Sequence, residues 1–267
     1  MRAARAVICG LARDGAARLP ATIPQLERLA AGFGEARIVI YENDSADETP
    51  EVLRAWAARD ARVSVVCETL GRPPLRSGRS DARSTALADA RARCQRAALA
   101  RCAGFDYALV LDTDLLGFDG DGVAHALGCD GWDALAAKGV SFREDGVGGF
   151  VCPDVWAFRR PGQVEHTRNG AEVHRFVPPR GAPLVPVDSC FGGLAVYRME
   201  AFASGCYAGG DCEHVHFHAS LRRAGFGRIF MDPSLLALYP DFVELYPRWR
   251  SKHAPPASAD GAPGTSG

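Results

Sequence analysis

The chain has 267 residues, of which 47% are hydrophobic and 24% charged, and its formal net charge at pH 7 is −1. A chain of this length can bury the core of one large α/β domain. Its near-neutral charge excludes a strongly basic nucleic-acid-binding protein, so we expect no nucleic-acid partner. Arginines crowd residues 72–101, either to serve an anionic small ligand or because this chain uses arginine where others use lysine.

The cysteines and the apolar runs indicate the compartment. Nine cysteines are scattered without a Cys-x-x-Cys pair, and several lie inside apolar runs, as small buried hydrophobic residues do. No signal peptide opens the chain, and no apolar stretch approaches the roughly 18 residues that span a bilayer. We therefore expect no transmembrane segment and a cytoplasmic protein. Residues 254–267, rich in Pro, Ala, Gly and Ser, are expected to form a disordered tail.

Four short apolar runs predict strands, at residues 6–10, 37–41, 63–67 and 107–111. Helical segments separate them. Apolar residues recur at i, i+3 and i+4 spacing over residues 23–33. Alternation of strands and helices predicts parallel strands with right-handed crossovers, which is a Rossmann-like arrangement.

Two further helices complete this first half of the chain. Thr49, Pro50 and Glu51 fit an N-cap, a proline at the first helical position and an acid at the positive end of the helix dipole. The region from Gly71 to Gly78 is too rich in helix breakers to be regular, and a long helix is predicted over about residues 85–101.

After Asp114 the pattern changes to shorter runs with more Gly, Pro and aromatic residues. This predicts a mixed sheet with long loops, and such loops commonly form a substrate site. The expected fold class is therefore α/β, in a single domain over residues 1–253. A Rossmann-like half (6–118) would join a loop-rich half (119–250) through a mixed central sheet.

Residues 107–114, Tyr-Ala-Leu-Val-Leu-Asp-Thr-Asp, carry the most informative motif. A buried strand would deliver Asp112 and Asp114 to its carboxyl edge, where ligands bind in open α/β sheets. Two hard oxygen ligands suit Mg²⁺ or Mn²⁺, which could bridge a nucleoside diphosphate. The alternative is that the acidic pair only caps a turn or helix.

The second strand ends in Tyr-Glu-Asn-Asp-Ser-Ala-Asp-Glu-Thr, residues 41–49, and here the chain resembles GT-A glycosyltransferases. In that fold such a cluster holds the base and ribose of a nucleotide, and Glu42 and Asn43 could offer acceptor and donor atoms to a base edge. The alternative is that polar residues here only leave the strand and cap a helix. Through the resemblance, the nucleotide-sugar would contact Ala12, Arg13, Glu42, Asn43, Asp44, Arg83, Arg91, Asp112, Thr113 and Asp114.

Several segments resemble the fungal capsule-associated α-1,3-mannosyltransferase family and its bacterial relatives, over roughly residues 6–240. They are Arg83 with Leu87-Ala88 and Arg91, Asp-x-x-Ala-x-Arg at 154–159, Ser-Cys-aromatic-x-Gly at 189–193, and Cys-Glu-His at 212–214 before a helix ending at Gly225. Phe191-Gly192 stands where that family is expected to have Trp-Asn, and Ala92 where Asn is expected.

Three histidines follow Glu213. On a helix His214 and His218 share a face, while His216 points elsewhere. GT-A enzymes often complete the metal shell from this region, so His214 is predicted to join Asp112 and Asp114 around Mn²⁺. At least two of the three histidines are expected only to pack or cap. A zinc site built from Cys212 and these histidines is a less favoured alternative.

The resemblance implies a metal-dependent hexosyltransferase. Its cofactor would be Mn²⁺ or Mg²⁺, its donor a UDP- or GDP-sugar, and its acceptor a hydroxyl of a glycan, a lipid-linked sugar or a natural product. Arg83 or another basic residue would assist the leaving diphosphate. Retention of configuration is expected, with Glu213 and Asp154 binding sugar hydroxyls and Asp188 a third candidate carboxylate. The place of Glu213 would also suit the base of an inverting enzyme.

Two rival functions are a nucleotidyltransferase and a non-catalytic nucleotide- or carbohydrate-binding module. A nucleotidyltransferase usually has a glycine-rich phosphate loop early in the chain. Here the first strand runs into Leu-Ala-Arg-Asp-Gly, residues 11–15, with a single glycine. The intact Asp-x-Asp pair argues against a module that has lost activity.

Overall fold

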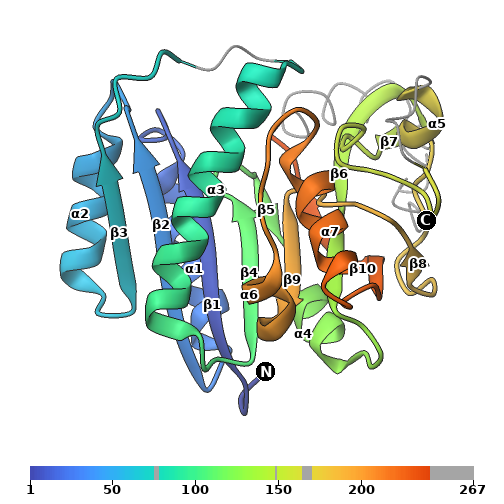
Figure 1. Ribbon diagram of the computed structural model, residues 1–267, viewed down its shortest axis with the longest axis horizontal. Helices are drawn as coiled ribbons and strands as arrows, with labels where there is room; N and C mark the ends of the chain where they lie inside the picture. The colour runs from blue at the N-terminus through green and yellow to red at the C-terminus, as the bar shows by residue number, and fades with distance from the viewer. Residues whose placement is uncertain (75–77, 148, 164–169, 241–267) are drawn as a thin grey trace, which may run out of the picture.

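The computed structural model describes residues 1–74, 78–147, 149–163 and 170–240, so the tail predicted over 254–267 lies outside it. The first half contains β1 (Arg5–Ala12), α1 (Leu19–Ala31), β2 (Glu35–Asn43), α2 (Thr49–Arg59), β3 (Val63–Glu68), α3 (Asp81–Cys102) and β4 (Tyr107–Asp112). The remainder contains β5 (Gly117–Phe118), α4 (Gly120–Gly128), β6 (Ala134–Val147), β7 (Phe150–Val151), α5 (Gly170–His174), β8 (Val185–Pro186), β9 (Leu194–Arg198), α6 (Met199–Ser204), α7 (Glu213–Arg223) and β10 (Ile229–Leu238). Figure 1 shows their arrangement.

One sheet runs through both halves, with strand order β3-β2-β1-β4-β9-β6-β10-β5; β7 pairs with β6 and β8 with β10. The strands β3, β2, β1 and β4 are mutually parallel. From β4 onward the sheet is mixed, because β9 is antiparallel to β4 and β6, while β10 is parallel to β6. The α/β fold with a mixed central sheet is therefore confirmed. The four predicted strands are β1, β2, β3 and β4, each one to four residues longer than its apolar run.

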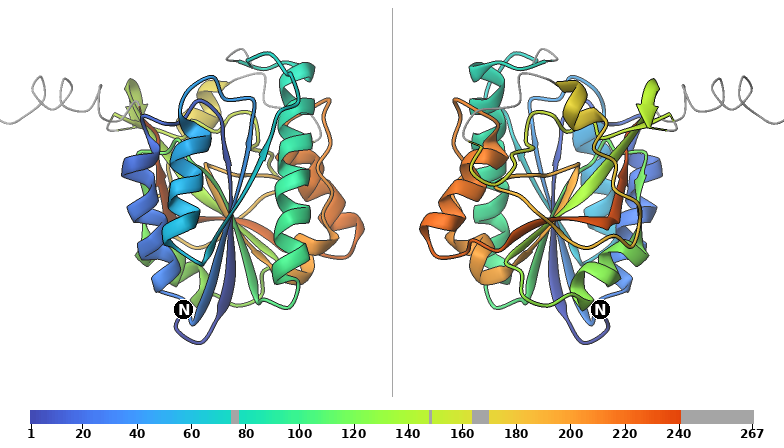
Figure 2. Two further views of the ribbon diagram at one scale, coloured as in Figure 1. Left: turned by 90° about the vertical axis from the view of Figure 1, so that its left-hand side faces the viewer. Right: turned by 90° about the vertical axis from the view of Figure 1, so that its right-hand side faces the viewer.

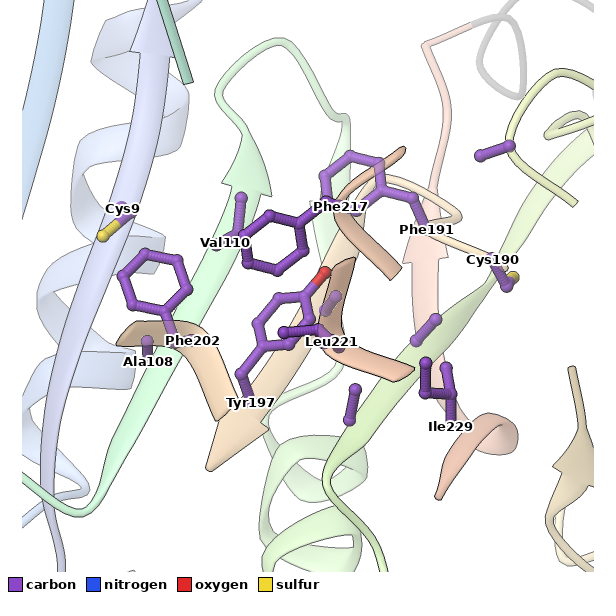
Figure 3. Close-up of a cluster of buried hydrophobic side chains, with 14 of the residues drawn as sticks. Cys9, Ala108, Val110, Cys190, Phe191, Tyr197, Phe202, Phe217, Leu221 and Ile229 are labelled. Carbon is purple, nitrogen blue, oxygen red and sulfur yellow. The ribbon is translucent and has the colours of Figure 1, made fainter. Parts of the chain in front are cut away.

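Helices cover both faces of the sheet, as the side views in Figure 2 show. Successive residues of a strand point to opposite faces. In β1, Val7 and Cys9 accordingly enter one core layer, and Ala6 and Ile8 enter the other. The first layer packs against α3, α6 and α7, and the second against α1, α2 and α4. Figure 3 shows the first layer, where Phe217 lies among aromatic rings near β4 and β9.

Two helix starts differ from the sequence prediction. The helix α3 begins at Asp81, four residues before the predicted Thr85, because the Ser80 hydroxyl accepts a hydrogen bond from the Arg83 N–H and caps it there. Thr49 is the first residue of α2 and not its N-cap. Its hydroxyl bonds to an Asp47 carboxylate oxygen and accepts the N–H of Gly15, which ties the turn to the end of β1.

The nine cysteines all lie in the part of the chain that the structure describes, and none forms a disulfide. Of the cysteines that lie inside apolar runs, which predicts burial, Cys9, Cys94 and Cys102 are buried, whereas Cys67 is only partly buried. The search for membrane spans, made over these same residues, finds no helix with the length and apolar character that crossing a bilayer requires.

Candidate active site

A cavity of about 690 Å³ opens where β1, β2 and β4 end. Most of the residues that the sequence singled out line it: Ala12, Arg13, Asn43, Arg83, Arg91, Asp112, Thr113, Asp114, Asp154, Glu213 and His214. The carboxyl ends of parallel strands meet at one edge of a sheet, which is why segments so far apart in sequence converge here. Residues from both halves of the chain therefore form the walls of the cavity.

The Asp-x-Asp pair lies where β4 ends. Asp112 is the last residue of the strand and is partly exposed, and Asp114 is exposed. Thr113 anchors the turn between them, because its hydroxyl donates to the Leu11 carbonyl at 2.6 Å and its carbonyl accepts from the Thr22 hydroxyl at 3.0 Å. Burial raises the pKa of Asp112 to about 7; Arg91 opposes this rise and the charge of Asp114 adds to it.

Arg91 links the Asp pair to helix α7. Its side chain is 5% exposed, and Nη2 lies 2.6 Å from Oδ1 of Asp112. Nε lies 3.7 Å from Oε1 of Glu213, and the guanidinium lies over the Phe191 ring at 4.9 Å. Nε and Nη1 have no hydrogen-bond partner in the described part of the chain. A buried cation with unused donors suits a ligand that brings acceptor oxygens.

His214 lies in the first turn of α7, as predicted. Its ring stacks on Phe191 with centroids 3.7 Å apart, and Nε2 lies 3.5 Å from Oε1 of Glu213. Burial lowers the pKa of His214 well below its usual value, so the imidazole is neutral at pH 7, the form that binds a metal. Neither ring nitrogen has a hydrogen-bond partner among the described residues.

The other histidines behave differently. His218 shares the buried face with His214, as the helical spacing predicts, but both of its nitrogens are used. Nδ1 lies 3.0 Å from the Ser189 hydroxyl, and Nε2 lies 3.1 Å from the Tyr197 hydroxyl. His218 is therefore a core histidine, and His216 is only partly buried.

The donor set around the Asp pair fits a hard divalent cation. The Asp114 carboxylate makes no hydrogen bond or ion pair with any described residue, and only Oδ1 of Asp112 is engaged, by Arg91. Oxygen ligands of this kind suit Mn²⁺ or Mg²⁺. In the described ranges no three His, Cys, Asp or Glu side chains are grouped so that they could hold a metal ion, so neither Cys212 with the histidines nor His214 with the Asp pair forms an assembled three-residue site.

Two of the residues predicted to contact a nucleotide serve the chain itself. Glu42 is 2% exposed, and its carboxylate accepts the N–H of Ser45. Asp44, at φ +54°, accepts the N–H groups of residues 70–72 and therefore holds the segment after β3. Neither lines the cavity; both border a neighbouring hollow of about 330 Å³. Asn43 does line the cavity, and its amide donates to Asp44.

Two predicted carboxylates of the second half are also bound to backbone. Asp154 lines the cavity, but Oδ2 accepts the N–H groups of Phe191 at 3.0 Å and Gly192 at 2.7 Å, and Oδ1 accepts that of Ala157. Asp188 does not line the cavity. Its Oδ2 accepts the N–H of Gly162 at 2.7 Å, so the carboxylate holds the distant turn at Gly162 instead of a ligand.

Sequence reasoning gave no site role to several wall residues: Arg18, Tyr41, Trp156 and Tyr239. Arg72, also on the wall, belongs to the arginine-rich stretch for which an anionic ligand was one interpretation. Trp156 lies inside the Asp-x-x-Ala-x-Arg motif at 154–159, and an aromatic residue in a loop is the sequence signal that could have pointed to it. Tyr239 follows the last strand, β10, which is inserted in the sheet between β6 and β5. No local pattern in the sequence indicates that placement.

Comparisons with known proteins concern the fold. No protein-family model matches the chain, and no curated protein matches it. A mannosyltransferase from Pyrobaculum calidifontis, PcManGT in complex with GDP-Man and Mn²⁺, is similar with a TM-score of 0.52 and 16% identity, covering 94% of this chain and 60% of that one. GalNAc-T7 with UDP, GalNAc and Mn²⁺ gives a TM-score of 0.55 at 14% identity, covering 89% and 44%.

Glucosyl-3-phosphoglycerate synthase from Mycobacterium tuberculosis, in complex with Mn²⁺, UDP and phosphoglyceric acid, is also similar. The TM-score is 0.51 at 16% identity, and the match covers 97% of this chain and 82% of that one. The chain spans less than two thirds of the first two structures. At this level of identity the likeness shows the fold, and the fold is the predicted GT-A fold. None of these structures shows that the chain is related to the fungal capsule-associated mannosyltransferases in particular.

Proposed function

We propose that the protein is a metal-dependent glycosyltransferase that moves a hexose from a nucleoside-diphosphate sugar to a hydroxyl. One observation carries the proposal. Asp112 and Asp114 stand at the end of β4 on the floor of the cavity, and Asp114 has no partner in the described chain. The GT-A-fold structures reported above hold Mn²⁺ with GDP-Man or UDP, which supports the same chemistry here.

Asp112 and Asp114 would hold the cation, with His214 as the proposed third ligand. A divalent cation supplies positive charge that stabilises a leaving diphosphate. Arg13, Arg83 and Arg91 line the same cavity and would neutralise the remaining phosphate charge. Asn43 would face the nucleotide at the end of β2.

The stereochemical outcome that we propose is retention. An inverting mechanism needs a free carboxylate to take the proton of the acceptor. Glu213 is 3% exposed and faces Arg91, and the Asp154 oxygens accept three backbone N–H groups. In a retaining mechanism the leaving diphosphate takes the acceptor proton, so neither carboxylate is needed as a base. The anomeric coupling constant of the product by NMR tests this, and an inverted product would overturn it.

The test of the function is nucleotide binding followed by transfer. Calorimetry with UDP and with GDP, with and without Mn²⁺, should show Mn²⁺-dependent binding to one of them, followed by turnover of the matching sugar donor. Asp114→Asn keeps the shape but removes the charge, and it should weaken Mn²⁺-dependent binding at least about tenfold, or about 1.4 kcal/mol. Asp188→Asn is the matched control, because Asp188 lies outside the cavity. Equal binding by both variants would refute the site.

His214→Ala tests the third ligand separately. Here we expect weaker Mn²⁺ affinity, while nucleotide affinity without metal stays the same. The ring nitrogens of His214 make no hydrogen bond to a described residue, so removing the imidazole breaks none that holds Asp112 or Asp114. Unchanged Mn²⁺ affinity would remove His214 from the proposed shell and leave the two aspartates.

A further inference from the structure

The cavity carries its described positive charge mostly on one side, and Arg91 reaches from that side to Glu213 on the other. Its arginines, Arg13, Arg18, Arg72, Arg83 and Arg91, come from the segments after β1 and β3 and from α3. The opposite wall comes from the second half of the chain. The described residues that line that wall include Trp156, Phe191, Glu213 and Tyr239, and none of them is a lysine or an arginine. A diphosphate therefore belongs on the first side, and the second side suits an uncharged molecule.

Trp156 differs from the other tryptophans of the described chain. Trp56 and Trp132 are each 1% exposed, and each donates its indole N–H, to Glu27 and to the Cys129 carbonyl. Trp156 is partly exposed at the cavity wall, and its indole N–H has no hydrogen-bond partner in the described residues. It therefore gives the cavity wall an aromatic side chain that packs partly against the core and keeps an unused donor.

Hydrogen bonds hold the backbone of the turn that carries Trp156. Oδ1 of Asp154 accepts the N–H of Ala157 at 3.1 Å, and Nη1 of Arg159 donates to the Trp156 carbonyl at 2.8 Å. Arg159 is itself 1% exposed and pairs with Asp211, at 2.8 and 3.0 Å. Fixing the backbone on both sides of Trp156 lowers the entropy lost when a ligand orders its ring.

Tyr239 adds a second donor to this wall. Its ring lies so close to Gly139 that a Cβ there would be 3.0 Å from Cε2, and the same Cβ would be 3.0 Å from the Gly192 carbonyl. A glycine at 139 therefore makes the room that the tyrosine ring occupies. Burial first, and then the charges of Asp154, Asp112 and Asp114, raise the pKa of Tyr239, so its hydroxyl keeps its proton.

We propose that Trp156 and Tyr239 form the acceptor platform, and that the acceptor is an uncharged pyranose, as in a neutral glycoside. The C–H face of a pyranose is apolar and its rim carries hydroxyls, which matches a partly exposed indole with two donors at hand, its own N–H and the Tyr239 hydroxyl. A phosphorylated or carboxylated acceptor would face Asp154 and Glu213, and the one described cation that reaches this wall, Arg91, is already paired with Asp112 and Glu213.

This proposal rests on the proposed function. In the transfer step the bond from the anomeric carbon to the diphosphate oxygen breaks, and its electron pair leaves with the diphosphate. A new bond forms from that carbon to the acceptor oxygen, and the acceptor proton passes to the diphosphate. Trp156 and Tyr239 orient the ring that carries this hydroxyl, so they set the specificity for the acceptor.

The first experiment measures binding by tryptophan fluorescence. Methyl pyranosides of glucose, galactose, mannose and N-acetylglucosamine are titrated into the full chain with Mn²⁺ and the nucleoside diphosphate that binds. At least one should change the emission, and Trp156→Phe should abolish that change. Glycerate 3-phosphate is the anionic comparison. If only glycerate 3-phosphate binds, or if the change persists in Trp156→Phe, the proposal is overturned.

The second experiment separates KM from kcat for the glycoside that binds. Trp156→Ala should raise the acceptor KM at least about tenfold, and Trp156→Phe should recover most of it, because an aromatic face is restored. Tyr239→Phe should raise it severalfold. Affinity for Mn²⁺ and nucleotide should stay within about twofold in each variant. Phe105→Ala, a partly exposed aromatic at the opposite edge of the sheet, is the matched control.

The two levels of inference fail differently. Loss of nucleotide binding or of transfer in the unaltered protein would refute the glycosyltransferase itself. Normal nucleotide binding with an acceptor KM that is unchanged in Trp156→Ala would refute only the acceptor platform.

Discussion

The charges at the floor of the cavity stand in a chain of contacts, from Asp112 through Arg91 to Glu213 and His214. Three of these side chains are at most 5% exposed. Burying charges is unfavourable unless each has a partner, and breaking a buried pair costs roughly 3–5 kcal/mol. Arg91 is the shared partner of the Asp112 and Glu213 carboxylates, and its unused donors stay available for a ligand.

Asp112 should make the stability of the metal-free protein depend on pH. Its pKa is about 7 in the folded protein and 3.8 as a free side chain, so the folded state binds more protons than the unfolded state between these values. This contribution to the free energy of unfolding is therefore full below about pH 4, is lost as the pH rises towards 7, and changes no further above that. The slope cannot exceed about 1.4 kcal/mol per pH unit.

Asp112→Asn isolates this effect, because all other ionisable groups are common to both proteins. Urea unfolding with a chelator at pH 5, 6, 7 and 8 should show that the variant gains stability relative to the original chain as the pH rises to 7. The difference should then level off. Parallel pH profiles would mean that Asp112 titrates normally in the folded state.

At the scale of elements, carboxylates hold the loops to the strand ends. Asp44 binds the segment after β3, Asp47 binds the turn after β1, and Asp154 binds the turn before β9. Backbone N–H groups of irregular segments must find acceptors when they are buried, and a short carboxylate can serve two or three of them. Some of the acidic residues that the sequence suggests as ligand contacts are thus free to bind a ligand, and others bind backbone N–H groups.

The turn before β9 depends on a glycine. Gly192 has φ +61°, and a Cβ there would collide with the Ala137 carbonyl and lie 2.7 Å from the Gly139 N. Gly192→Ala should therefore cost more than the about 1–2 kcal/mol of left-handed strain alone. Gly131→Ala is the control, since Gly131 has φ +74° with open space around its Cβ position. Urea unfolding of both variants measures the difference; equal losses would mean that the turn accommodates a side chain.

For the whole molecule, the sequence predicted the parallel half well, because each strand and helix there follows from local apolar periodicity. Asp112, Asp114, Arg91 and His214 line one cavity, where the sequence placed the first two because they follow a strand end and the other two through the family resemblance. The sequence could not predict which carboxylates would accept backbone N–H groups, as Glu42 does. Those assignments depend on loop contacts across many residues, and no period in the sequence encodes them.

The single sheet predicts that both halves unfold together. Its strands support two core layers, one on each face, so loss of either layer exposes the same strands. Leu26→Ala in α1 and Phe217→Ala in α7 remove fully buried side chains from opposite layers, at a cost of about 2–5 kcal/mol each. Each should shift one common transition, seen at the same urea concentration by far-ultraviolet circular dichroism and by tryptophan fluorescence. Two transitions, of which each variant moves only one, would show that the layers belong to separately folding units and that the single-domain prediction is wrong.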